Sequence, residues 1–252
     1  MAILKLQDVS LTYHSLLGET TALKNITFSV DEGEFIGIVG PSGCGKTTIL
    51  SLISGLLKPS SGNILIDEEP VVKTSDKTGY MFQKDHLFEW RNIINNILLG
   101  LEIKKQKEGR VFAEELINKY GLTDFKKHYP SELSGGMRQR VALIRTLTLN
   151  PKILLLDEPF SALDYQTRLE VCDDVSNIIK QEKKTVVLVT HDIAEAISLS
   201  DRILILSTRP AIIKKIIPVP FSKENSPLKK REHKNFRILF EEIYQELKNE
   251  AK

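Results

Sequence analysis

The sequence predicts an α/β fold in which a buried parallel sheet is preceded by an antiparallel β subdomain and carries an inserted helical subdomain. Three observations support this prediction. Short runs near the N-terminus alternate apolar and polar residues, three later runs are continuously apolar and end in polar residues, and the apolar spacing between the first two of these is helical. A length of 252 residues suits one large domain, or one domain with a subdomain and a tail.

The N-terminal part of the chain is expected to form sheet with one face in water. Residues 3–7, 11–13 and 26–30 alternate with a period of two, and polar turns such as residues 18–21 separate them. Such alternation places apolar side chains on one face only. We therefore predict an antiparallel β subdomain here.

Three runs farther along the chain have the character of strands covered on both faces. Residues 35–39, 153–156 and 186–189 are continuously apolar, and residues 203–206 predict another strand. Ligands bind at the carboxyl ends of the strands in open parallel sheets, so the polar residues that follow these runs are candidates for a site. A glycine-rich turn follows the first run, and the residues after the other two are Asp157, Glu158, Pro159, Thr190, His191 and Asp192.

Between the first two runs the apolar residues recur at helical spacing. We interpret residues 88–150, approximately, as a helical subdomain inserted into the α/β core. Periodicity alone leaves open the alternative that these helices simply pack on the sheet. The recurring positions are Phe112, Leu116, Tyr120, Met137, Val141, Ile144 and Thr148.

The main domain is predicted to span residues 1–208. Prolines interrupt the pattern from residue 209 and basic residues gather in this part of the chain, so residues 209–252 are predicted as a linker and a C-terminal amphipathic helix. The basic residues could contact anionic lipid, although a solvated tail is the simpler interpretation. The apolar face of the helix would comprise Phe236, Leu239, Phe240, Ile243, Tyr244 and Leu247.

Composition limits the classes of partner and compartment. A net charge of +2 with 27% charged residues favours neither a dedicated nucleic-acid binder nor an acidic disordered chain. Cys44 and Cys172 are too few and too far apart for a disulfide framework or a zinc site, which suggests a reducing, cytoplasmic setting. The N-terminus lacks the apolar core of a signal peptide, and no stretch approaches the ~20 apolar residues of a membrane span. Any membrane role would therefore depend on a partner.

A phosphate-binding loop is the strongest local signal. The pattern GxxxxGK[ST] lies between the first buried run and a helix-like run. Backbone N–H groups would surround the β- and γ-phosphates of ATP, Lys46 would add a cation, Thr47 would hold Mg²⁺ and Thr48 would reach the α-phosphate. Cys44 could be a reactive thiol at a helix start, but a small filler residue is the favoured interpretation. The predicted ATP-binding residues here are Gly40, Pro41, Ser42, Gly43, Cys44, Gly45, Lys46, Thr47 and Thr48.

Two adjacent carboxylates complete the predicted chemistry. Asp157 would bind Mg²⁺ through water, and Glu158 would polarise the attacking water. Asp-Glu pairs alone are common and are usually solvated. The apolar run directly before this pair favours the functional interpretation.

The segment Leu133-Ser134-Gly135-Gly136-Met137-Arg138-Gln139-Arg140 resembles the signature motif of the ABC ATPases, and the resemblance covers residues 13–201, approximately. It implies a P-loop NTPase core of the ABC ATPase type. Taken alone, Tyr13 could be an ordinary strand aromatic, Gln83 a surface amide and His191 a structural histidine. The order and spacing of all three along the chain favour the family roles. In the family roles, Tyr13 would stack on the adenine, and Gln83 would sense and ligate the metal. His191 would bind the γ-phosphate. Asp164, in the motif Ser161-Ala162-Leu163-Asp164, would communicate across a dimer.

The resemblance also implies a head-to-tail dimer. Ser134 and two glycines lie where a helix is expected to begin, so exposed N–H groups could receive a γ-phosphate. Each ATP would lie between the Lys46 loop of one subunit and the signature residues of its partner. The residues that would contact the partner's ATP are Ser134, Gly135, Gly136 and Gln139.

Within the family, the stretch of residues 79–91 resembles the importers of nitrate, sulfonate, taurine and related solutes. Glu89 stands where a proline is common, and residues 144–147 replace an alanine-rich helix. The resemblance implies an ATPase on the inner face of the cell membrane, with a separate permease and an extracellular solute-binding protein as partners. An exporter subunit is the alternative. A nucleic-acid ATPase is disfavoured because the interval from Lys46 to Ser134 is compact and lacks heptads.

Residues 87–91 are hypothesised to form part of the groove that receives the permease. Large apolar residues directly after Gln83 would connect metal sensing to a partner surface. The alternative is that Phe88 and Trp90 belong to the core of the helical subdomain, and tryptophan serves both purposes.

Overall fold

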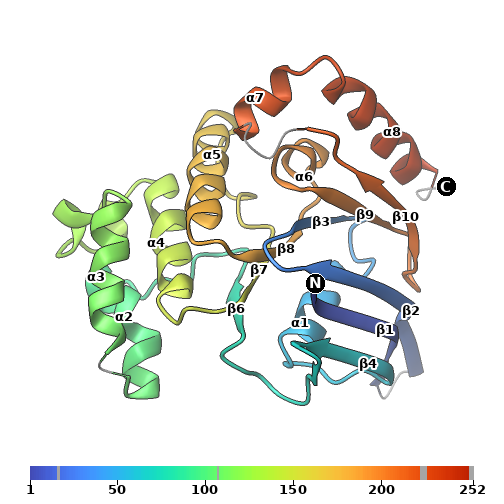
Figure 1. The fold of residues 1–252 in the computed structure, drawn as a ribbon, viewed down its shortest axis with the longest axis horizontal. Coiled ribbons are helices and arrows are strands. Elements are labelled where there is room, and N and C mark those ends of the chain that lie inside the picture. The colour runs from blue at the N-terminus through green and yellow to red at the C-terminus, as the bar shows by residue number, and fades with distance from the viewer. Residues whose placement is uncertain (16–17, 107, 222–225, 250–252) are drawn as a thin grey trace.

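Two β-sheets and helix α1 (Lys46–Ile53) share one hydrophobic core (Figure 1). The computed structural model describes residues 1–252 except 16–17, 107, 222–225 and 250–252. The four-stranded sheet has the order β2-β1-β4-β5 and the six-stranded sheet the order β10-β9-β3-β8-β7-β6. The first comprises β1 (Ala2–Ser15), β2 (Gly18–Asp31), β4 (Ser61–Ile66) and β5 (Glu69–Pro70). The second comprises β3 (Phe35–Val39), β6 (Thr78–Met81), β7 (Ile153–Asp157), β8 (Thr185–Val189), β9 (Arg202–Leu206) and β10 (Ile213–Pro218).

The antiparallel β subdomain predicted from alternation is confirmed, with longer strands than expected. The runs at residues 3–7 and 11–13 join into the single strand β1, which pairs with both β2 and β4. The register with β2 shifts between Leu6 and Val9, where Asp8 has a φ of 50° and its N–H donates to Thr27 Oγ1 at 2.8 Å. This irregularity shifts the alternation, so the pattern looks like two strands in the sequence.

The four apolar runs all form strands of the six-stranded sheet, whose strands are parallel except for the edge strand β10. Side chains alternate between its two faces. Ile36 and Ile38 pack toward the antiparallel sheet and α1, whereas Phe35 packs toward the helices on the other face. Because both faces are covered, these strands need apolar residues at every position.

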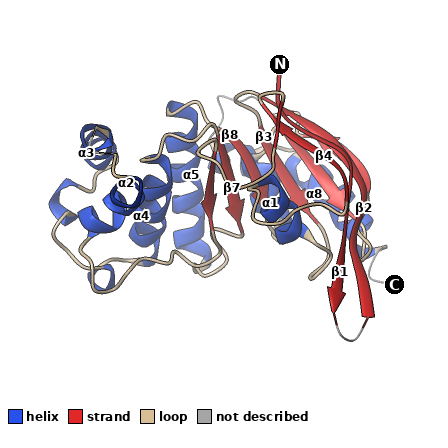
Figure 2. Ribbon diagram, turned by 90° about the horizontal axis from the view of Figure 1, so that it is seen from below, coloured by secondary structure: helices blue, strands red, loops and turns tan. Residues whose placement is uncertain are grey.

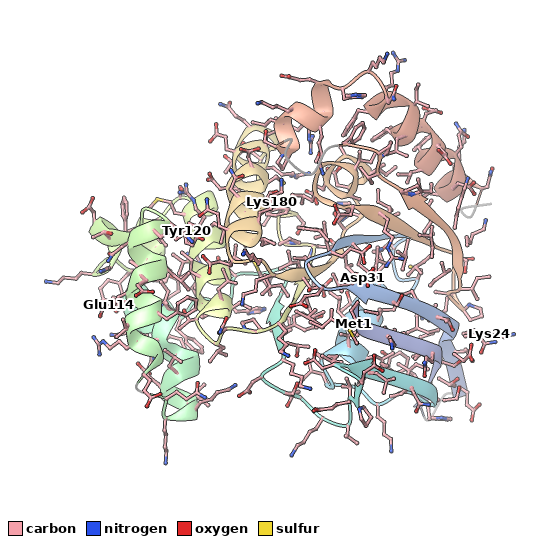
Figure 3. The ribbon with its side chains drawn as sticks, in the orientation of Figure 1. Met1, Lys24, Asp31, Glu114, Tyr120 and Lys180 are labelled. Carbon is pink, nitrogen blue, oxygen red and sulfur yellow. The ribbon has the colours of Figure 1, made fainter. Side chains whose placement is uncertain are left out.

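The helical subdomain lies at the end of the molecule opposite the antiparallel sheet (Figure 2). Its helices α2 (Ile93–Lys104), α3 (Gly109–Lys119) and α4 (Gly135–Leu147) follow β6 and precede β7. Among its contacts with α5 (Tyr165–Gln181) are two at the C-cap of that helix, where Lys119 Nζ and Tyr120 Oη donate to Glu182 Oε1 at 2.7 and 2.5 Å. Figure 3 shows Tyr120 between this subdomain and α5.

Residues 209–252 contain more regular structure than a linker and one helix. Strand β10 pairs with β9, and α7 (Pro227–Glu232) precedes the amphipathic helix α8 (Phe236–Lys248). Helix α8 lies over β9 and β10 (Figure 1), and its residues Leu239 and Ile243 pack there together with α6 (Ile193–Leu199). Two of the prolines that suggested a linker occupy positions where proline is tolerated, because Pro218 ends an edge strand and Pro227 begins α7. Within the described residues, no helix combines the length and apolar character needed to cross a bilayer.

Candidate active site

The glycine-rich loop connects β3 to α1, as the motif predicts. Lys46 is buried, and its Nζ donates to the carbonyl oxygens of Gly40 and Pro41 at 2.9 and 3.0 Å. Gly45 has a φ of 125°, and a Cβ there would lie 2.8 Å from Leu23 Cδ2. Only glycine fits this position, so the lysine and the first N–H groups of α1 are held beside one another.

The carboxylate of Asp157 lies directly beside this loop. Its Oδ1 accepts a hydrogen bond from Thr47 Oγ1 at 3.0 Å, and its Oδ2 accepts one from Tyr80 Oη at 3.1 Å. Burial raises the pKa of Asp157 above its usual value, although both hydrogen bonds and Lys46 oppose this shift. Burial and the neighbouring Asp157 also raise the pKa of Tyr80, so its hydroxyl remains a donor at neutral pH.

Glu158 is shared by two of the predicted functional residues. Its Oε2 lies 3.0 Å from His191 Nδ1 and accepts a hydrogen bond from Gln83 Nε2 at 3.3 Å. Glu158 has a φ of 46°, and its N–H donates to the carbonyl of Val189 at 2.8 Å. The ends of three strands therefore meet here, because Gln83 from the segment after β6 and His191 from the segment after β8 both contact the carboxylate of Glu158, directly after β7. Gln83 lies against Glu158 and Ser161 rather than beside Thr47 and Asp157, the other two predicted metal ligands.

Tyr13 and Cys44 occupy different environments around the loop. Tyr13, half-exposed near the end of β1, has its Oη 3.3 Å from Thr48 Oγ1. An aromatic ring is thus available beside the loop for stacking. Cys44 is buried, and burial raises the pKa of its thiol, which supports a small filler residue rather than a reactive thiolate.

Ser134 is the N-cap of helix α4. Its Oγ accepts a hydrogen bond from Met137 N at 3.3 Å, and both Ser134 and Gly135 are exposed. Gly136 is required for packing, because a Cβ there would lie 2.7 Å from Val171 Cγ2 on α5. Gln139 is buried, and its Oε1 has no hydrogen-bond partner in the part of the chain that the structure describes. The helix start is therefore open to solvent on its Ser134 side.

Comparison with known proteins decides the family. The ABC transporter family profile matches residues 23–161. The chain belongs to the ABC transporter family. It is 47% identical over 252 residues to the uncharacterised ABC transporter ATP-binding protein YtlC of Bacillus subtilis, covering 98% of this chain and 96% of that protein. It is 43% identical over 224 residues to the aliphatic sulfonates import ATP-binding protein SsuB of Bacillus cereus, and the match covers 87% of this chain and 89% of that protein.

Solved ABC cassettes share the fold. A dimeric structure of the ATP-binding cassette MJ0796, in a post-hydrolysis state bound to ADP and Pi, matches with a TM-score of 0.72 and 33% identity, covering 87% of this chain and 100% of that one. A second dimeric structure of the same cassette matches with the same TM-score. The α/β fold of ABC ATPase type predicted from the sequence is confirmed, and the chain is an ATPase subunit of an ABC transporter.

The turn that joins β7 to α5 of this ABC ATPase contacts the signature residues of the same chain. Asp164 caps α5, because its Oδ1 accepts a hydrogen bond from Thr167 N at 3.0 Å. This backbone hydrogen bond lowers the pKa of Asp164 below its usual value. A Cβ on Gly135 would lie 3.0 Å from Leu163 Cδ2, so the turn and the start of α4 are in close contact.

No site role was predicted for several of the residues that contact the site. Tyr80 lies on β6, one strand over from Asp157, and only strand adjacency could have indicated it. Ser161 accepts a hydrogen bond from Gln83, and Arg209 donates to the carbonyl of Gly43 at 2.5 Å from a segment 166 residues away. Arg168 contacts the segment after His191 and is described below.

Proposed function

We propose that this ATPase hydrolyses MgATP in a head-to-tail dimer and thereby energises the uptake of a small sulfonate-like solute through a separate permease. The observation that carries the proposal is the position of Glu158, whose Oε2 lies 3.0 Å from His191 Nδ1 and 3.3 Å from Gln83 Nε2. A water held by this group would be polarised beside the phosphate-binding loop. The relative named for aliphatic sulfonate import supports the solute class.

The oxygen atoms around Asp157 fit a magnesium ion. Mg²⁺ prefers oxygen ligands and binds through one or two protein groups together with phosphates. Thr47 Oγ1 and Asp157 Oδ1 lie 3.0 Å apart, and the buried carboxylate would gain a compensating charge. When bound, the ion would neutralise charge on the phosphates. Gln83 would reach the ion only by turning away from Glu158.

Other residues of the chain would bind the nucleotide, activate the attacking water and contact the partner subunit. The N–H groups of the loop and Lys46 would bind the β- and γ-phosphates, and Tyr13 would stack on the adenine. Glu158 would accept a hydrogen bond from the attacking water, and His191 would orient that water and the γ-phosphate. The exposed start of α4 at Ser134 would complete the site of the partner subunit. Asp164 would communicate between the two sites.

A membrane partner follows from the family. We infer that the chain binds the cytoplasmic side of a permease in the cell membrane and receives the signal of an extracellular solute-binding protein through it. Trp90 supports a partner surface because it is 75% exposed and packs against Phe88, with tilted rings whose centroids lie 4.7 Å apart. This exposure disfavours the alternative in which Trp90 belongs to the core.

Reconstitution provides the test of the whole proposal. The chain, its permease and its solute-binding protein would be placed in liposomes, and ATP hydrolysis would be measured with and without a two-carbon alkanesulfonate. We expect hydrolysis to rise with the sulfonate in the wild type and to be lost in a Glu158→Gln variant. Hydrolysis that responds to nitrate alone would reject the solute class, and hydrolysis unaffected by Glu158→Gln would reject the active site.

A further inference from the structure

Arg168 connects two segments that flank the active site. It lies in the first turn of α5, four residues after the helix cap Asp164. Its Nη2 donates to the carbonyl of Leu163 at 2.9 Å, and its Nη1 donates to Asp192 Oδ2 at 3.2 Å. The guanidinium group therefore joins the β7–α5 turn to the residue directly after His191.

Asp192 is fixed at both of its carboxylate oxygens. Oδ1 accepts hydrogen bonds from Ala194 N at 2.8 Å and Glu195 N at 3.1 Å, which caps α6, while Oδ2 accepts from Arg168. The N–H of Asp192 donates to Thr190 Oγ1 at 3.0 Å. His191 thus lies between two residues held by side-chain hydrogen bonds, although its own imidazole is 60% exposed.

A buried carboxylate completes this cluster. Glu195 is 2% exposed, and its Oε2 accepts a hydrogen bond from Thr190 Oγ1 at 2.7 Å. Its Oε1 lies 3.7 Å from Arg168 Nε, which has no hydrogen-bond partner among the described residues. The guanidinium group consequently faces the carbonyl of Leu163 and two carboxylates, with one nitrogen toward each.

We propose that Arg168 is a positioning residue that holds the His191 segment in register with the β7–α5 turn and so keeps the imidazole against Glu158. The proposal rests on the hydrolytic role of Glu158 and His191 given above. Arg168 does not touch Glu158 or His191, and it acts through Asp192 and Thr190. The contact with Leu163 also places this cluster beside Asp164 and, through Leu163, beside Gly135.

The geometry requires arginine rather than a positive charge alone. Three nitrogens of one planar group point to three acceptors, the Leu163 carbonyl in the β7–α5 turn and two carboxylates at the start of α6. A lysine would present a single ammonium group, which could pair with Asp192 or reach the Leu163 carbonyl but could not hold the planar arrangement. Arg168→Lys therefore removes the planar arrangement of nitrogens and keeps the positive charge, whereas Arg168→Met removes both.

Steady-state ATP hydrolysis by the purified protein provides the measurement. We expect Arg168→Met to lower kcat by about tenfold and Arg168→Lys by several-fold, with the KM for ATP changed less than about twofold, because misplacing an orienting group affects the chemical step more than binding. Arg110→Met is the matched control, since Arg110 is exposed on α3 and pairs only with Glu114 in the described structure. The control should have wild-type kcat and KM.

Two further readouts separate positioning from simple loss of stability. Measured on the residual rate of a His191→Ala variant, Arg168→Met should lower kcat no further, because the imidazole that Arg168 positions is gone. In the wild-type background, Arg168→Met should also shift the imidazole ¹⁵N signals of His191, assigned by comparison with His191→Ala. Arg168→Lys should fold with a thermal midpoint near that of the wild type.

The outcomes distinguish this inference from the proposed function. If Glu158→Gln and His191→Ala strongly lower kcat while Arg168→Met leaves kcat unchanged, the positioning role is wrong and the active site stands. A full tenfold loss from Arg168→Met on top of His191→Ala would also overturn it, since that result indicates an independent structural effect. If Glu158→Gln turns over normally, the proposed function itself fails.

Discussion

His191 Nδ1 lies 3.0 Å from Glu158 Oε2, the same oxygen that accepts a hydrogen bond from Gln83 Nε2 at 3.3 Å. One carboxylate oxygen of Glu158 thus contacts side chains from two segments, one that follows β6 and one that follows β8. Changes in either segment would alter the environment of Glu158. The predictions below use this arrangement and the elements that surround it.

Glu158→Gln should retain ATP binding but turn over about 10²–10⁴ times more slowly, because an amide cannot accept a proton from water. The variant should accumulate as an ATP-bound dimer on size-exclusion chromatography. Glu170→Gln, at an exposed position on α5, is the control and should hydrolyse ATP at the wild-type rate. Monomeric Glu158→Gln in saturating MgATP would contradict the prediction.

Lys46→Ala should weaken nucleotide binding itself. The loss of one charge-assisted contact is expected to cost about 1.5–3 kcal/mol, which corresponds to roughly a 10- to 100-fold increase in Kd. Titration with a fluorescent ATP analogue would measure it. The exposed Lys24, at the edge of the molecule in Figure 3, offers a control, because Lys24→Ala removes the same charge outside the loop motif and should leave Kd unchanged.

Ser134→Ala removes a helix cap and a proposed partner contact together. The free energy of unfolding should fall by about 0.5–2 kcal/mol, and Asn92→Ala should cost about as much, since Asn92 caps α2 through Asn95 N at 3.0 Å. Only Ser134→Ala should also reduce ATP-dependent dimerisation and hydrolysis. If Ser134→Ala and Asn92→Ala hydrolysed ATP at the same rate, Ser134 would not contribute to the partner subunit's site.

Glu182→Gln should reveal a pH-dependent contribution to stability. Burial raises the pKa of Glu182, but hydrogen bonds from Lys119 and Tyr120 outweigh it, so the net pKa is lowered in the folded protein. A lowered pKa stabilises the fold above the unfolded-state value near 4.3 and ceases to do so as the pH falls through the folded value.

The wild type should therefore exceed Glu182→Gln by about 1 kcal/mol near pH 7, and the gap should close as the pH falls below about 4. Thermal unfolding across this pH range gives the comparison. Glu114→Gln, which alters an exposed pair with Arg110, should show a smaller gap at every pH. A gap that widened on acidification would have the wrong sign for this mechanism.

Trp90→Ala should weaken binding to the permease without destabilising the chain. Trp90 is 75% exposed, so its truncation should change the free energy of unfolding by less than about 0.5 kcal/mol. Co-purification with the permease should be lost or strongly reduced. Ile103→Ala, at a position on α2 that is 73% exposed, is the control. An intact, normally coupled complex containing Trp90→Ala would refute the interface.

Much of the fold could be predicted because both faces of the central sheet are covered. Strands such as β7 must then be apolar throughout, and the polar residues at their ends are conspicuous in the sequence. The phosphate-binding loop was equally visible, since its glycines are fixed by local geometry. The continuity of β1 was missed because the register shift near Asp8 disturbs the two-residue pattern.

The unpredicted contacts depend on tertiary arrangement. Tyr80 meets Asp157 because β6 and β7 are neighbours, and Arg168 meets Asp192 because α5 begins beside α6. Neither pair has a characteristic spacing along the chain. Strand β10 was missed because the prolines in this part of the chain suggest a linker, although an edge strand accommodates Pro218 at its end.

The contact between Leu163 and Gly135 has a consequence for a paired molecule. In a head-to-tail dimer, Gly135 of one subunit would face the nucleotide bound by its mate, whereas Leu163 lies in the turn that follows that subunit's own Glu158. A Cβ on Gly135 would lie only 3.0 Å from Leu163 Cδ2, so a displacement of one segment would move the other. Each subunit would thereby transmit the departure of phosphate from its own pocket to the contact that its Gly135 makes with its neighbour's nucleotide, so that the two sites would be coupled rather than independent.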